Sequence, residues 1–222
     1  MKDYIKIHPW SIVEEGFDAS RNKVSESLFS IGNGRMGQRA NFEEAFSGPT
    51  LKGSYIAGIY YPDKTRVGWW KNGYPEYFAK VLNSVNWNRI EVAVDGVPLD
   101  MAKTVPTHFR RELDMQNGLL KRQYEVNING NTLKAETERF CSMQRKNLGV
   151  IRYSITAEKD CSIAISSGLS GDVRNQDANY DEFFWKTRRQ VFTISLLPGF
   201  HRKPAKLTLV CMPYAATAGM RA

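Results

Sequence analysis

Two strand-turn patterns constrain the fold of this chain more than any other feature of its sequence. The stretch 90–94 alternates apolar and polar residues up to Asp95-Gly96, and the stretch 124–128 does the same up to Asn129-Gly130. Alternation with a period of two is typical of a strand with one buried face, and both dipeptides favour the tight type I′ turn of a β-hairpin. Each pattern therefore predicts two antiparallel strands joined by a two-residue turn.

Further strands are expected on both sides of these hairpins. The stretches 53–61, 147–157 and 161–169 have the composition of strands, and no window of 12 residues combines a 3.6-residue apolar repeat with caps at both ends. Short strands joined by Gly, Asn and Asp turns are typical of an antiparallel sandwich or barrel. The predicted fold class is all-β.

The stretch FSIGNGRMG contains a G-x-G-x-x-G pattern formed by Gly32, Gly34 and Gly37. A dinucleotide-binding turn with this pattern needs a helix that opens at the third glycine and an acidic residue about 20 positions further on. Gly48-Pro49 would end such a helix early, and no Asp or Glu lies between residues 45 and 62. We therefore expect the glycines to supply positive φ angles and close backbone approach in a crowded loop.

The charge distribution argues against a nucleic-acid partner. The formal net charge is +8, but residues 186–222 hold seven Lys and Arg and no Asp or Glu, which leaves 24 basic and 23 acidic residues before them. A nucleic-acid-binding face would spread its basic residues over a folded surface, interleaved with aromatic ones. The break in composition predicts a domain of residues 1–190 and a basic tail of residues 191–222, which is either a last strand or a segment from a truncated or frame-shifted gene.

The sequence carries no signal for secretion, membrane insertion or metal binding. It has neither an apolar run of 18 residues nor an apolar signal-peptide core in its first residues, MKDYIKIHPW. Its three cysteines, Cys141, Cys161 and Cys211, are too few and too scattered for a disulfide framework and fit no zinc spacing. We expect a cytoplasmic protein without a membrane partner, a metal or another cofactor.

Motifs for catalysis are sparse. The three histidines, His8, His108 and His201, are not accompanied by a G-x-S-x-G nucleophile turn. Adjacent residues of a strand point to opposite faces, so the carboxylates of Glu43-Glu44 are expected to point apart rather than to act on one ligand. The expected role of Arg39 with Glu43 or Glu44 is an ion pair that fixes the loop.

An aromatic segment, residues 60–80, holds the candidates for ligand contact. Seven Tyr, Trp and Phe residues lie in it, interrupted by Gly and Pro. Flat aromatic faces stack on the apolar faces of sugars, and the same rings would serve an interface between domains or subunits. The candidates for carbohydrate or domain-interface contact are Trp69, Trp70, Tyr74 and Tyr77.

The stretch ESLFSIGNGRMGQRANFEE, residues 26–44, resembles the opening motif of glycoside hydrolase family 65, which includes maltose, trehalose and kojibiose phosphorylases. In that family an E-x-L-F-x-x-G-N-G-x-x-G-x-R block precedes an acidic pair. Ala40 replaces a usual Gly, and Ser84-Val85 replaces a usual Leu-Pro. Further similar blocks follow in the family order at 53–61, 85–96, 110–126 and 136–156. The motif residues found here are Gly32, Asn33, Gly34, Gly37, Arg39, Glu43 and Glu44.

This resemblance implies that the chain is the N-terminal domain of a longer enzyme. Family members have a large antiparallel β-sandwich of the galactose-mutarotase-like, super-sandwich type, followed by a helical linker, an (α/α)6 catalytic barrel and a small C-terminal sheet. The family is inverting: a Glu of the barrel protonates the glycosidic oxygen while phosphate or water attacks from the opposite face. Nothing in this chain corresponds to the barrel, so no catalytic residue is carried over and the chain alone is expected to be inactive.

For the whole enzyme the resemblance implies an α-glucoside disaccharide such as maltose as substrate, with inorganic phosphate or water as the attacking group. The sandwich would support the barrel, shape one wall of the active-site mouth and assist a homodimer. The alternative, from a different class, is a stand-alone carbohydrate-binding module that uses the aromatic segment 60–80.

Overall fold

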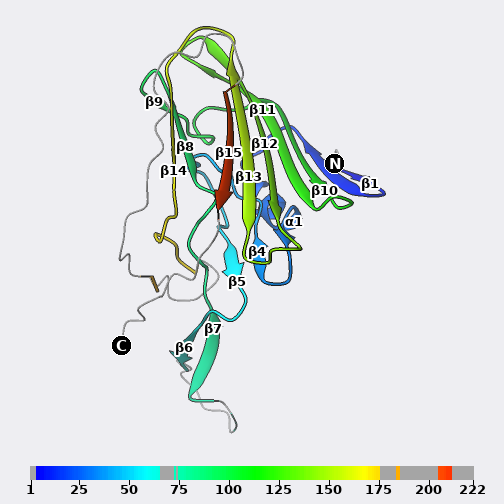
Figure 1. Cartoon of the computed structure of the whole chain (residues 1–222), viewed down its shortest axis with the longest axis vertical. Helices are drawn as coiled ribbons and strands as arrows, with labels where there is room; N and C mark the ends of the chain where they lie inside the picture. Colours follow the sequence, from blue (N-terminus) through cyan, green and yellow to red (C-terminus); the bar gives the residue numbers. More distant parts are fainter. Residues whose placement is uncertain (1–3, 66–72, 74, 176–183, 186–204, 212–222) are drawn as a thin grey trace.

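The computed structural model describes residues 4–65, 73, 75–175 and 184–185, together with the backbone of residues 205–211. Antiparallel strands dominate this part of the chain (Figure 1). The elements are β1 Ile5–His8, β2 Ser11–Glu15, α1 Asn22–Leu28, β3 Ile31–Gly32, β4 Met36–Gln38, β5 Ser54–Ile56, β6 Tyr60–Lys64, β7 Tyr77–Val81, β8 Ile90–Val94, β9 Val97–Pro98, β10 Thr107–Asp114, β11 Leu119–Ile128, β12 Asn131–Cys141, β13 Gly149–Ala157, β14 Ile163–Ser167 and β15 Ala205–Cys211.

The strands form one large sheet, two three-stranded sheets that share its core, and a separate two-stranded hairpin. The large sheet has seven strands in the order β1-β2-β10-β11-β12-β13-β15, and every neighbouring pair is antiparallel. Two three-stranded sheets have the orders β14-β8-β9 and β3-β4-β5, and β6 pairs with β7 alone. Figure 1 shows the β6–β7 hairpin extending away from the rest of the molecule. The predicted all-β antiparallel sandwich is confirmed.

Strand alternation separates a buried face of the large sheet from a charged one. Along β11, every second residue from Leu120 to Ile128 is buried, and the apolar ones share a core with Ile90 and Val92 of β8. The opposite face carries partly exposed ion pairs, such as Lys134 Nζ to Glu125 Oε1 at 2.9 Å. One face packed on the core and one face exposed to solvent are typical of an antiparallel sheet that forms one layer of a sandwich.

Both predicted hairpin turns have the backbone geometry that the sequence requires. Asp95 and Gly96 have φ angles of 48° and 78°, and Asn129 and Gly130 have 52° and 75°. Positive φ at both central residues is the signature of the type I′ turn. The turns join β8 to β9 and β11 to β12, as expected.

One predicted strand is divided in the structure. The stretch 53–61 contains two strands, β5 and β6, separated by a turn at Ala57-Gly58. Gly58 has a φ of +87°, which a residue inside a strand does not adopt. The division turns the chain into the protruding β6–β7 hairpin.

The short helix α1 has no apolar face, which explains why the sequence pattern does not reveal it. Its buried residues are Asn22, Ser25 and Glu26, whereas Val24 and Leu28 are 52% and 49% exposed. Spacings of three and four residues place the buried polar side chains on one side of the helix. No helix among the described residues is long and apolar enough to cross a membrane.

Residues 205–211 form the edge strand β15, which pairs with β13 from Ala205↔Ile155 to Cys211↔Gly149. Residues 191–204 and 212–222 of the predicted basic tail lie outside the described residues. The division of the chain at residue 190 stays a prediction.

Candidate functional site

The glycine motif lies in the β3–β4 hairpin, where Gly32 pairs with Gly37. A Cβ atom on Gly32 would lie 2.9 Å from the carbonyl oxygen of Met36, and Gly34 has a φ of +80°. Close backbone approach and positive φ therefore account for these two glycines. A Cβ on Gly37 would meet nothing within 4 Å, so contacts inside the described chain do not require that glycine.

Asn33 holds the turn of this hairpin and joins it to a distant loop. Its Oδ1 accepts hydrogen bonds from the backbone N–H groups of Arg35 at 3.0 Å and Met36 at 2.8 Å. Its Nδ2 donates to the carbonyl oxygens of Ser142 at 2.7 Å and Lys146 at 3.1 Å. The G-N-G sequence is thus an anchor between the hairpin and the β12–β13 connection.

The acidic pair Glu43-Glu44 lies in a bend and converges on one guanidinium. Arg122 Nη2, from β11, donates to Glu44 Oε2 at 2.6 Å and also to Glu43 Oε2. All three side chains are at least 95% buried. The expectation that the two carboxylates point apart is wrong, because the bend frees them from the alternation of a strand.

Two tyrosines and a second arginine complete this buried cluster. Tyr124 and Tyr153 donate their hydroxyls to Glu44 Oε1 at 2.5 Å and 2.8 Å. Arg139 Nη1 lies 3.3 Å from Glu43 Oε1. Two arginines facing two carboxylates make the cluster neutral, as burial demands.

Burial and charge together fix the protonation states of Glu43, Tyr124 and Tyr153. Burial raises the pKa of Glu43, but the charges of Arg122 and Arg139 outweigh it, so the pKa lies below its usual value. Burial also raises the pKa values of Tyr124 and Tyr153 well above their usual range. Glu43 is therefore held ionised and the tyrosines neutral, which suits structural ion pairing and not proton transfer.

Arg39 occupies a different place from the one expected. Its Nη1 donates to the Ser27 hydroxyl at 2.7 Å, and its backbone N–H donates to the carbonyl of Gly53 at 2.9 Å. The arginines that the structure places against Glu43 are Arg122 and Arg139.

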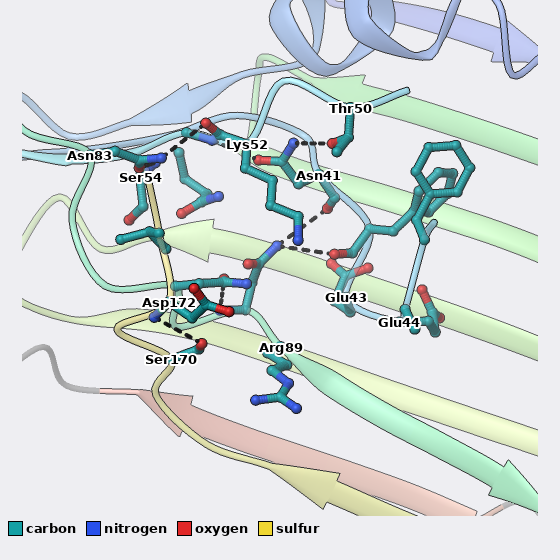
Figure 2. Close-up of a pocket in the computed structure, with 18 of the residues that line it drawn as sticks. Asn41, Glu43, Glu44, Thr50, Lys52, Ser54, Asn83, Arg89, Ser170 and Asp172 are labelled. Atoms are coloured by element: carbon teal, nitrogen blue, oxygen red, sulfur yellow. Dashed lines mark hydrogen bonds between the residues drawn. The ribbon is translucent and has the colours of Figure 1, made fainter. Parts of the chain in front are cut away.

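A polar cavity of about 400 Å³ lies over the acidic pair. Its walls come mainly from residues 41–54, 83–91 and 170–173. Figure 2 shows the Lys52 side chain extending into the middle of this space, with Asp172 on another wall. Most of the residues that line the cavity are polar, and the cavity is partly open to solvent, so it can admit a polar molecule.

Residues 12–210 match the family described as glycosyl hydrolase family 65, N-terminal domain. The chain belongs to this family. Maltose phosphorylase from Bacillus subtilis (strain 168) is 44% identical over 182 residues, which are 82% of this chain and 24% of that protein. Nigerose phosphorylase from Lachnoclostridium phytofermentans is 32% identical over 164 residues, which are 74% of this chain and 20% of that protein.

A solved structure from the human microbiome, provisionally named a kojibiose phosphorylase, has the same fold. It matches with a TM-score of 0.71 and 30% identity, over 77% of this chain and 23% of that chain. The chain thus spans about a quarter or less of the length of these relatives. The family 65 resemblance is confirmed, and this chain corresponds to the N-terminal domain of the family.

Of the aromatic candidates in this family 65 domain, the structure describes Tyr77. It lies in β7, on the same face of the β6–β7 hairpin as Tyr60 and Val81, and all three are about half exposed. Trp69, Trp70 and Tyr74 lie outside the described residues. Contact of these rings with a sugar or another domain stays a prediction.

Sequence reasoning missed the buried arginines of the sheet, although a signal for them exists. Arg122 falls in phase with Leu120 and Tyr124 on the buried side of β11. Arg111 of β10 is equally buried, 3.4 Å from Glu14, and burial lowers its pKa to about 10. A charged residue at a position that alternation places among the buried apolar residues of a strand predicts a buried ion pair, because charged side chains are rarely buried without a partner. Within the described part of the chain no group of His, Cys, Asp and Glu is placed to hold a metal ion.

Proposed function

We propose that this chain is the non-catalytic N-terminal part of an inverting α-glucoside phosphorylase that acts on maltose. The single observation that carries the proposal is the 44% identity to a maltose phosphorylase over 82% of this chain. The relatives named for nigerose, kojibiose and trehalose are 29–32% identical. Inorganic phosphate would be the second substrate. The alternative reaction is hydrolysis, in which water attacks in place of phosphate.

The chemistry of the buried cluster supports a non-catalytic role. An inverting reaction needs a general acid with a raised pKa and an attacking group on the opposite side of the sugar. Burial raises the pKa of Glu43, yet two arginines outweigh it and keep the pKa low. We propose that the sandwich supports the catalytic barrel and shapes one wall of its mouth. A cytoplasmic location and a homodimer belong to the same proposal.

The test compares the polypeptide encoded by the complete gene with the 222-residue chain. Both are incubated with phosphate and, separately, with maltose, nigerose, kojibiose or trehalose, and glucose 1-phosphate is measured. We expect release from maltose by the complete enzyme and none by the 222-residue chain. Release of glucose without phosphate would replace phosphorolysis by hydrolysis. Glucose 1-phosphate formation by the shorter chain would overturn the non-catalytic role.

A stand-alone carbohydrate-binding module is the second candidate. The observation that favours it is the exposed aromatic face of the β6–β7 hairpin, where Tyr60 and Tyr77 are 48% and 51% exposed. Such a module would bind sugar through these rings, and Tyr77→Ala would abolish binding. Unchanged binding by that variant would exclude this role for the ring.

A further inference from the structure

The cavity over the acidic pair has a lining that the proposed scaffold role does not use. Phe46, half-buried, contributes an aromatic ring to it. Amides and hydroxyls both donate and accept hydrogen bonds, which suits a ligand with many hydroxyl groups. The amide and hydroxyl side chains of the walls, besides that of Gln38, are Asn41, Ser47, Thr50, Ser54, Asn83, Ser84, Asn86, Asn88 and Ser170.

Most charges around the cavity are already neutralised by protein partners. Glu43 and Glu44 are bound from behind by Arg122. Arg89 Nε donates to Glu91 Oε1 at 3.1 Å, so the opposite charges of this exposed pair balance each other. These groups therefore present little net charge to a molecule in the cavity.

Among the remaining charged side chains of the lining, that of Asp100 is also partnered, and those of Lys52 and Asp172, of opposite charge, have no partner among the described residues. Asp100 accepts from the backbone N–H of Ser47 at 3.0 Å and has a second partner in Lys103 at 3.7 Å. Lys52 and Asp172 line the cavity, and the described part of the chain gives their charged ends no hydrogen-bond or ion-pair partner. Because these two charges balance, they favour a neutral ligand. Such a ligand would accept a hydrogen bond from Lys52 and donate one to Asp172. An anion such as phosphate could pair with Lys52, but the carboxylate of Asp172 would repel it.

A buried acceptor on the cavity wall also lacks a donor. Gln38 is 3% exposed and lines the cavity, and its Oε1 has no hydrogen-bond partner among the described residues. Its Nε2 is used, because it donates to the carbonyl of Arg39 at 3.2 Å. An unsatisfied buried acceptor is costly, but this oxygen exposes almost no surface to a molecule in the cavity, so Gln38 is not counted among the ligand contacts.

The walls are fixed before any ligand enters. Asn83 Oδ1 accepts from the backbone N–H of Ser54 at 2.8 Å, and its Nδ2 donates to the carbonyl of Lys52 at 3.1 Å. Asn86 and Ser170 exchange two backbone hydrogen bonds at 2.8 Å and 2.9 Å. Walls joined in this way lose little freedom on binding, which favours affinity.

We propose that this cavity binds a neutral saccharide of one or two hexose units. Its volume of about 400 Å³ lies at the lower end of the range of about 300–1,000 Å³ that is usual for ligand pockets. Lys52 and Asp172 contact hydroxyl groups of the sugar, and the ring of Phe46 faces its C–H groups. The site belongs to the N-terminal domain itself and is independent of whether the complete enzyme cleaves maltose.

Isothermal titration of the 222-residue chain with glucose, maltose or inorganic phosphate tests the site. We expect dissociation constants for the sugars in the millimolar range or tighter, and no binding of phosphate. The double variant Lys52→Ala/Asp172→Asn should weaken sugar binding at least about tenfold. The matched control is Lys146→Ala/Glu158→Gln, which removes two exposed charges outside the cavity and should bind as the wild type does.

Two further measurements make each outcome decisive. Circular dichroism melting confirms that the variants fold, and chemical-shift changes of the side-chain amides of Asn41 and Asn83 report on the cavity without any substitution. The proposal is overturned by an absence of sugar binding or by equal binding of both double variants. It is also overturned if Tyr77→Ala loses binding while the variant Lys52→Ala/Asp172→Asn keeps it. The last result would assign binding to the aromatic hairpin. Failure of phosphorolysis by the complete enzyme would affect the proposed function only.

Discussion

Replacing Arg122 by methionine removes the cation that the two carboxylates of the buried cluster share. Arg122 is 4% exposed and contacts both Glu43 and Glu44, while its guanidinium lies 4.9 Å from the ring centroid of Phe42. Methionine preserves much of the volume but leaves the two carboxylates with Arg139 as their remaining arginine. Removing one partner of a buried pair costs about 3–5 kcal/mol, a large part of a total stability of about 5–15 kcal/mol.

This cost depends on pH, and its sign follows from the pKa of Glu43. In the wild type the folded pKa lies below the ordinary value of 4.5, so the stabilisation is present above that value and is lost as the pH falls through the folded pKa. Without Arg122, burial raises the folded pKa above the ordinary value. The variant then loses stability as the pH rises, and the difference from wild type grows between about pH 5 and pH 7.5.

Urea unfolding followed by circular dichroism at both pH values measures the effect. With an m-value of about 1–3 kcal/mol/M, the midpoint at pH 7.5 should fall by at least about 1 M. The control is Arg152→Met, which breaks an ion pair with Glu138 whose side chains are 56% and 33% exposed and should cost about 0–1 kcal/mol. Equal costs for the two variants, or an Arg122→Met cost that does not change with pH, would refute the reasoning.

Two further predictions use the same unfolding assay. Tyr153→Phe removes a hydroxyl that donates to Glu44 at 2.8 Å, so it should cost about 1.5–3 kcal/mol; a cost near zero would mean that this hydrogen bond is not formed in solution. Gly32→Ala places a Cβ 2.9 Å from the Met36 carbonyl oxygen and should cost about 1–3 kcal/mol. Gly37→Ala, with open space around its Cβ, should be neutral or stabilising by up to about 1 kcal/mol, and equal effects of the two glycine variants would contradict the assigned hairpin geometry.

The sequence predicts the elements whose geometry is decided locally. Asp95-Gly96 and Asn129-Gly130 determine their turns through their own φ preferences, and the flanking alternation determines which strand faces are buried. The helix α1 escapes prediction because tertiary contacts, not an apolar stripe, bury Asn22 and Glu26. Asn22 Nδ2 donates to Glu26 Oε1 at 2.9 Å, and Arg111 Nη2, far along the chain, donates to Asn22 Oδ1 at 3.3 Å.

The residues of the family motif are recognisable in the sequence, but their partners are not. Glu44 meets Tyr124 and Tyr153, which lie 80 and 109 residues further along the chain. Asn33 meets the carbonyl of Ser142 at a separation of 109 residues. Nothing in the local pattern of the motif specifies such partners, so strand geometry alone led to the wrong expectation for the acidic pair.

These long-range contacts also determine how the role of the motif can be measured. The loop that carries Glu43 and Glu44 forms the floor of the polar cavity, and the same carboxylates hold that loop to β11 and β13. A substitution of either glutamate therefore lowers stability and deforms the cavity at once, and loss of sugar binding in such a variant would not identify a ligand contact. Lys52 and Asp172 line the same cavity without bonds to the described sheet. Binding and folding can be separated at these two residues, because their removal takes charge from the cavity and leaves the buried cluster intact.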